Sequence, residues 1–206
     1  MVVRQETHPG TGAGAQPEPF RVAVASMRTA RMRPEVLCEE MPAPQRIAPY
    51  ASALSADVTV DEVDVGTGRI ILLHDPAGND AWEGTFRCVA YVRAEIDPEL
   101  ITDPLLAAVG WSWLTEALEA HGAQYLAASG TVTRVATENF GGMADEEGSA
   151  QLELRASWSP AEAEDGSLDM AAHVEAWGEL LCTTVGLPPV PEGVTAMPSR
   201  RGQRGQ

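Results

Sequence analysis

The sequence predicts an α+β domain in the order helix, three strands, helix, two strands, helix, with a five-stranded, mainly antiparallel sheet. Two patterns lead to this prediction. Several segments alternate apolar and polar residues, as strands with one buried face do. Other segments carry apolar residues at helical spacing, and turns rich in Gly, Pro and Asp separate the two kinds.

One domain accounts for most of the chain. Its 206 residues, with 44% hydrophobic content, suffice for one core of ordinary size. Residues 1–19 contain almost no apolar side chains, so we expect them to be disordered. The α+β domain is predicted over residues 20–187, and an extended basic tail over 188–206. The arginines near the end of this tail are Arg200, Arg201 and Arg204.

The domain is predicted to begin with a helix over residues 20–33. Phe20, Val24 and Met27 share one stripe of this helix, which ends before Pro34. An irregular connection is expected next, because four prolines disfavour a helix there. They stand at positions 34, 42, 44 and 49.

Three strands are predicted after this connection. The first two cover residues 57–61 and 69–74 and form a hairpin around a Gly66-Thr67-Gly68 turn. The alternation is clearest over residues 85–96, where Cys88, Val92 and their alternate neighbours share an apolar face. The other face of this strand carries Arg87, Tyr91, Arg93 and Glu95 and is expected to be partly wet.

A central helix is predicted from Asp103, as N-cap, to His121, with Gly122 after its last turn. Strands over residues 125–137 and 151–158 follow, joined by an acidic loop. The last helix begins near Ser167 and ends at Gly186, which we expect to adopt a left-handed conformation before two prolines.

The central helix is the best functional clue, because its apolar arc is about twice as wide as a usual core stripe. Trp111 and Trp113 point in nearly opposite directions, so the helix needs two covers. One arrangement places the sheet on one side and a terminal helix on the other. The alternative exposes part of the arc as a dimer or partner interface, where Trp is a favoured anchor. The interface candidates are Trp111, Leu114 and Leu118.

The charge balance restricts the partners. The formal net charge is −16, with 30 acids against 14 basic residues that are all arginine. Such a chain repels nucleic acid and anionic membranes, although an RNA-associated role through the arginine-rich tail stays an alternative. No apolar run approaches the ~20 residues of a membrane span, and the N-terminus lacks a signal-peptide pattern. We therefore expect a cytoplasmic protein.

No catalytic, metal or cofactor motif is recognisable. The cysteines at positions 38, 88 and 182 form no CxxC pair, and the four histidines have no ligand at metal spacing, so neither a metal nor a cofactor is predicted. The only adjacent histidine and acid are His74 and Asp75, which precede a loop. An alternative enzyme or small-ligand pocket would therefore lie near His74, Asp75, Trp82 and Arg87.

Several phrases together resemble one protein family. They include LLHDPAGNDAWEGTFRCVAYVRAEI, DPLLAAVGWSWLTEAL, ASGTVTRV and GLPPVPEGVTAMPSRRGQR. The sequence is similar to the actinobacterial domain-of-unknown-function 3000 family over roughly residues 20–204. This resemblance implies a single cytoplasmic domain, but no activity and no site residues. Separately, the order of elements is similar to that of the type III secretion chaperones, which are dimeric and hold extended peptides.

We therefore expect a cytoplasmic, protein-binding or chaperone-like module that acts as a homodimer through its sheet and the wide face of the central helix. The excess apolar arc and the lack of a convergent polar site favour binding over catalysis. The partner is expected to be a protein or a second copy, with small-molecule binding left open.

Overall fold

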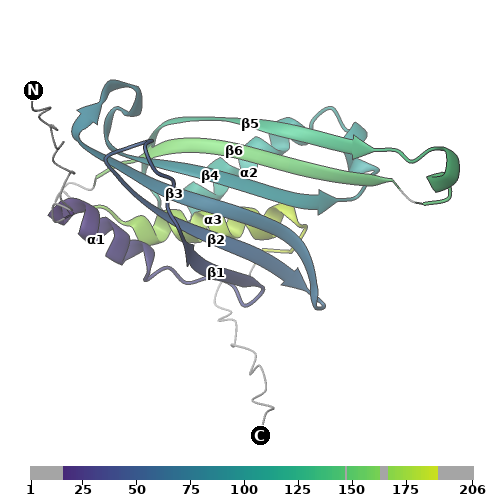
Figure 1. Cartoon of the computed structure of the whole chain (residues 1–206), viewed down its shortest axis with the longest axis horizontal. Coiled ribbons are helices and arrows are strands. Elements are labelled where there is room, and N and C mark those ends of the chain that lie inside the picture. Colours follow the sequence, from purple (N-terminus) through teal and green to yellow (C-terminus); the bar gives the residue numbers. More distant parts are fainter. Residues whose placement is uncertain (1–15, 147, 163–166, 190–206) are drawn as a thin grey trace, which may run out of the picture.

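A six-stranded sheet forms one layer of the fold in the part of the chain that the structure, a computed structural model, describes: residues 16–146, 148–162 and 167–189 (Figure 1). Every neighbouring pair of strands is antiparallel, and the order is β1-β2-β3-β4-β6-β5. The strands are β1 (Val36–Met41), β2 (Tyr50–Val60), β3 (Val63–Asn79), β4 (Gly84–Ile96), β5 (Tyr125–Thr137) and β6 (Ser149–Pro160).

Three α-helices of the described chain form the second layer, on one face of this sheet (Figure 1). They are α1 (Glu18–Met27), α2 (Leu106–Ala120) and α3 (Met170–Thr184). Helix α3 crosses the middle of the sheet and contacts β2, β3, β4 and β6. It also packs against both other helices, and α2 contacts β5. Three short 3-10 turns lie in the connections, at Asp80–Trp82, Leu100–Thr102 and Gly141–Met143.

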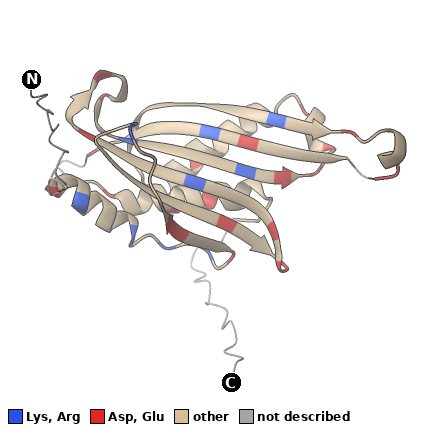
Figure 2. Cartoon of the chain, viewed as in Figure 1, with Lys and Arg blue, Asp and Glu red and all other residues tan. Residues whose placement is uncertain are grey.

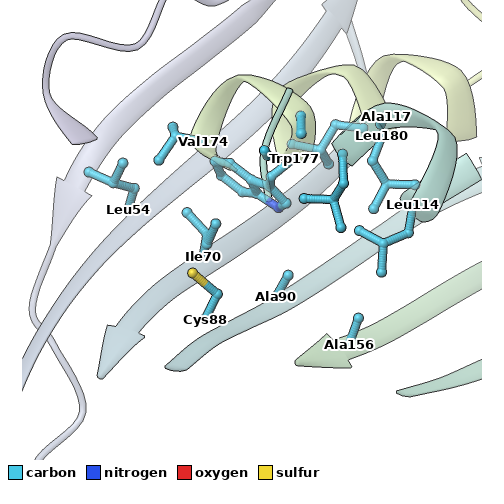
Figure 3. Close-up of a cluster of buried hydrophobic side chains, with 14 of the residues drawn as sticks. Leu54, Ile70, Cys88, Ala90, Leu114, Ala117, Ala156, Val174, Trp177 and Leu180 are labelled. Atoms are coloured by element: carbon cyan, nitrogen blue, oxygen red, sulfur yellow. The ribbon is translucent and has the colours of Figure 1, made fainter. Parts of the chain in front are cut away.

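The core lies between the two layers. Strand residues that alternate along the sheet, such as Ile70, Cys88 and Ala156, are buried and face α3. Figure 3 shows Trp177 of α3 pointing toward these strands, with Leu114 of α2 nearby. Because both layers contribute fully buried side chains, the hydrophobic effect holds the helices to this one face.

The predicted α+β class is confirmed, but the predicted number of strands is wrong. The prolines suggested an irregular connection, whereas β1 forms within it and β2 begins already at Tyr50. Pro34 precedes β1, Pro42 follows it, and Pro49 precedes β2, so none of the three breaks a strand. Val36 and Cys38 keep the alternation of a strand, but six residues between prolines gave too short a pattern to detect.

The predicted turn at Gly66-Thr67-Gly68 is also wrong. The chain turns at Asp61 and Glu62, both with positive φ, and the two glycines lie inside β3. A Cβ at Gly68 would stand 2.8 Å from the Tyr91 carbonyl oxygen and 2.9 Å from Leu181 Cδ2. The glycines therefore mark the place where α3 approaches the sheet closely, and not a change of chain direction.

For α2 and α3, the predicted C-terminal ends lie within two residues of the observed ones. Gly186 has positive φ after α3, as predicted, and Gly122 after α2 also has positive φ. The first helix, however, spans Glu18–Met27 and not residues 20–33, because the chain leaves it to reach β1. The Arg31 N–H then donates to Glu175 of α3 at 2.8 Å.

The segments predicted as disordered and as a basic tail lie mostly outside the described residues. Of residues 1–19, positions 16–19 are described, and α1 already begins within them, so the domain starts slightly before residue 20. Of residues 188–206, positions 188 and 189 are described.

We predict that Gly68→Ala lowers the free energy of unfolding by about 1–3 kcal/mol, the usual cost of overpacking a core. The new methyl group forces Leu181 and Trp177 away from the sheet. Urea denaturation measures this difference. Gly84→Ala is the matched control, because no atom lies within 4 Å of its added Cβ, and its stability should stay within about 0.5 kcal/mol of the parent.

Candidate binding surface on the open face of the sheet

The face of the sheet opposite the helices, called the open face below, carries the strongest cluster of functional groups. No described α-helix covers it, and in the view of Figure 1 it lies in front of α2 and α3. Its residues alternate with the core residues along each strand. Figure 2 shows both arginines and acidic residues along the strands of this sheet.

Three side chains form a row across the centre of the open face. The register places Arg69 of β3 opposite Tyr91 of β4, and Tyr91 opposite Arg155 of β6. The guanidinium carbon of each arginine lies 5.5 Å from the centroid of the Tyr91 ring. Both arginines therefore make cation–π contacts with one ring, which keeps their charged groups close together.

Glu153 of β6 lies beside this row, two residues before Arg155 and opposite Arg93. The Tyr91 hydroxyl donates to one of its carboxylate oxygens at 3.1 Å, and Arg155 donates to the other at 3.4 Å. Burial and the bond to Glu153 both raise the pKa of Tyr91, so the hydroxyl keeps its proton at neutral pH. Arg69 and Arg93, in contrast, form no ion pair with any described residue.

A hollow of about 320 Å³ opens beside the row. Its apolar lining comes from Ile71 and Val89, and its charged lining from the two arginines. The full set of lining residues is Arg69, Ile71, Val89, Ala90, Tyr91 and Arg155. The hollow can therefore receive an apolar group and an anionic group that lie side by side.

Arg87 strengthens the positive charge next to the hollow. It lies two residues before Val89 on the same face of β4 and is only 7% exposed. Its guanidinium donates to the Ala127 and Ser157 carbonyl oxygens and to three hydroxyl groups. These hydroxyls belong to Ser129, Ser157 and Ser159.

No carboxylate of the described chain bonds to Arg87, and burial lowers its pKa without removing the charge. Its bonds hold β5 to β6 at the irregular register between Leu126 and Ser129. Arg87 thus has a structural role. Its own buried positive charge is not neutralised by any carboxylate of the described chain.

The structure brings Trp82 and Arg87 together, because both bond to the Ser159 hydroxyl, but it does not gather all four predicted pocket residues. His74 and Arg87 point to opposite faces of the sheet, because Arg87 pairs with Leu73 and not with His74. The Asp75 carboxylate caps the Ala77 N–H at 3.0 Å, as an ordinary turn residue does. The Trp82 carbonyl oxygen accepts a hydrogen bond from Ser159.

His74 belongs to the core. Its ring stacks on Phe86, with centroids 4.2 Å apart, and on Phe20 of α1 at 5.9 Å. Its Nδ1 lies 3.0 Å from the Thr85 carbonyl oxygen, which only accepts, so Nδ1 carries the proton. Adjacent His and Asp residues predicted a site, but consecutive strand residues point to opposite faces.

The predicted interface on the central helix is also corrected. Leu114 and Leu118 are fully buried, so they are not available to a partner. Trp111 is half-buried and packs against β5, where a Cβ at Gly130 would lie 2.6 Å from its ring. The sheet packs on one side of α2 and α3 on the other, as in the first of the two arrangements considered from the sequence, but Leu105 and Val109 at the N-terminal end stay 63% and 40% exposed.

The three cysteines pack in or against the core, and the tail arginines lie outside the described residues. Burial raises the pKa of the Cys182 thiol to about 12 and also raises those of Cys38 and Cys88, so all three thiols stay protonated. No group of potential metal ligands occurs in the described part of the chain, and no described helix is long and apolar enough to cross a membrane. The tail arginines Arg200, Arg201 and Arg204 lie outside the described residues.

Sequence reasoning missed the row on the open face. Arg69 and Arg155 were assigned to predicted strands, and Tyr91 to the wet face of another. The sequence does not show the order of the strands in the sheet. In the structure β6, and not β5, lies next to β4, which places Arg155 opposite Tyr91. A search for arginines flanking an aromatic residue on the wet faces of several strands would have found the three candidates.

The fold and this face define an α+β protein with one sheet face left uncovered by the described helices. The chain belongs to the family described as "Protein of unknown function (DUF3000)", whose model matches residues 16–195. No curated protein and no solved structure gave a significant match. The similarity in element order to type III secretion chaperones therefore stays a prediction.

His173 of α3 generates a prediction about pH. It is buried, its Nδ1 accepts a hydrogen bond from Trp158 Nε1 at 3.1 Å, and burial lowers its pKa to about 4. Between about pH 6.5 and pH 4 the unfolded chain binds a proton here that the folded chain does not. The free energy of unfolding should therefore fall by about 3 kcal/mol from this group as the pH drops through that window.

Urea denaturation at several pH values measures the effect. His173→Phe removes the titrating group, so its stability should depend less steeply on pH, although it also loses the Trp158 bond. The half-buried His121, which lies near Glu175, serves as the control, and His121→Gln should keep most of the acid sensitivity. Equal pH dependence in His173→Phe and the parent would contradict this role.

Proposed function

We propose that this chain is a cytoplasmic protein-binding module whose open face docks an extended, acidic segment of a partner protein. The observation that carries the proposal is the row of Arg69, Tyr91 and Arg155 beside an open hollow. Arg87 and Arg93 add further positive charge to the same face, and Glu153 is the one acid that bonds within the row. The positive charge is local: it lies at the centre of the open face, while Glu39, Asp57 and Glu95 lie toward the margins of the same face. A short anionic segment can therefore bind at the centre, although the net charge of −16 opposes its approach from a distance.

The chemistry of the hollow favours a polypeptide. Ile71 and Val89 offer apolar surface directly beside the arginines, so a segment with acidic and apolar side chains satisfies both. A long nucleic acid would extend from this patch over the acidic remainder of the protein and meet repulsion there. A short acidic segment stays within the patch.

Binding is favoured over catalysis by the chemistry of the described side chains. The described histidines and cysteines lie in helices or among the strand residues that face the helices, away from the open face. The three thiols stay protonated, which makes them weak nucleophiles. The open face supplies charge, aromatic surface and hydroxyl groups, which suit recognition.

The test uses a short fluorescent peptide of Glu and Phe, with a Lys and Phe peptide for comparison. The parent protein should bind the acidic peptide and not the basic one, with an affinity that falls as salt is added. Arg69→Glu and Arg155→Glu should each weaken binding by roughly tenfold or more, since like charges then face each other. Fluorescence anisotropy measures the dissociation constants.

Arg21→Glu is the control with the same change of charge. Arg21 lies on α1, on the helix side of the sheet, and its side chain is well exposed. This variant should bind the peptide within about twofold of the parent. The proposal fails when the open-face variants bind as well as the parent, or when a single-stranded RNA oligonucleotide binds the parent more tightly than the acidic peptide does.

A further inference from the structure

The hairpin that connects β5 and β6 ends in a segment with unusual surface chemistry. This segment, residues 138–146, is called the tip below, and it extends beyond the end of the sheet (Figure 1). Phe140 at the tip is 76% exposed, the highest value among the large hydrophobic residues of the described chain. Met143, three residues later, is 51% exposed.

The tip has a defined conformation. Residues Gly141–Met143 form a 3-10 turn, and Gly141 has a φ of +64° that favours glycine. The Asn139 side chain donates to the Glu146 carbonyl oxygen at 3.4 Å and so links the two sides of the tip. An ordered turn presents Phe140 and Met143 with little loss of entropy on binding, which lowers the cost of association.

The tip carries only acidic charges, at Glu138, Asp145 and Glu146. None of these carboxylates forms an ion pair with a described residue. The tip therefore combines exposed apolar side chains with unpaired acids. The hollow of the open face offers the complementary set, because Arg69 forms no ion pair with a described residue and Ile71 and Val89 line the same hollow.

We propose that the tip of a second copy of this chain docks on the open face, so that two copies form a homodimer by exchanging tips. The inference rests on the proposed function, since it names an occupant of the same face. In a twofold dimer each copy gives one tip and receives one, which closes the assembly. A partner protein with an acidic, apolar segment then competes with the tip for the face.

A second copy of this chain is a better partner for the exposed Phe140 than the chain's own open face or a membrane surface. The tip lies beyond the end of its own sheet, away from the hollow between β3, β4 and β6 (Figure 1). An anionic membrane surface would repel its three carboxylates. The arginines of the open face attract the same carboxylates.

Light scattering and analytical ultracentrifugation test the proposal with two double variants. The tip variant, Phe140→Lys with Met143→Lys, removes the apolar contacts, opposes the arginines and keeps an intact open face. The face variant, Arg69→Glu with Arg155→Glu, keeps an intact tip. The parent should be a dimer at micromolar concentration, and each variant should dimerise with a dissociation constant raised roughly tenfold or more.

Mixing the two variants gives the sharpest result. The intact tip of one variant meets the intact face of the other, so the mixture should form heterodimers more readily than either variant forms homodimers. Val63→Lys is the control, because Val63 is 60% exposed but begins β3 in the β2–β3 hairpin and does not belong to the tip. It should dimerise like the parent. Circular dichroism confirms that each variant is folded.

A parent that stays monomeric overturns the proposed dimer, and so does a parent dimer that the tip variant leaves unchanged. Neither result affects the proposed function, which the peptide assay decides separately through Arg69→Glu and Arg155→Glu. Conversely, the parent could be monomeric while Arg69→Glu and Arg155→Glu lose peptide binding. This result would support the docking face and exclude a second copy as its partner.

Discussion

The close approach of α3 to the middle of the sheet determines the rest of the architecture. Leu181 and Trp177 reach the backbone of β3 because Gly68 has no side chain, and Val185 packs in the same way on Gly66. Once α3 is seated there, α1 and α2 pack beside it on the same face. The opposite face is then left to residues that must tolerate water, and arginine and tyrosine do so while covering apolar surface with their long side chains.

The parts of the fold that the sequence predicted correctly are those with long, regular patterns. Strands β4, β5 and β6 and helices α2 and α3 each show an alternation or a stripe over ten or more residues. Strand β1 was missed because six residues between prolines contain too little pattern, and Gly66 and Gly68 were mistaken for a turn. In both cases the deciding contact comes from a distant element, which local pattern cannot show.

The candidate site was harder to predict for the same reason. Every contact that defines it joins neighbouring strands, from the cation–π pairs of Tyr91 to the bonds of Arg87 with serines on β5 and β6. The sequence showed which residues share a face of one strand, but not which strands lie side by side. On α2 the sequence left two arrangements open, and the contacts with α3 and β5 agree with the one that covers the apolar arc mostly within the chain.

The short edge strand β1 also affects how the protein behaves in a crowded solution. An uncovered edge strand invites backbone pairing with another molecule, which is a common route to fibrils. Here Pro34 and Pro42 flank an edge of six residues, and Glu39 and Glu40 place negative charge along it. Backbone pairing with another molecule is therefore discouraged at this edge, which leaves the longer edge strand β5 as the place where a further strand could pair.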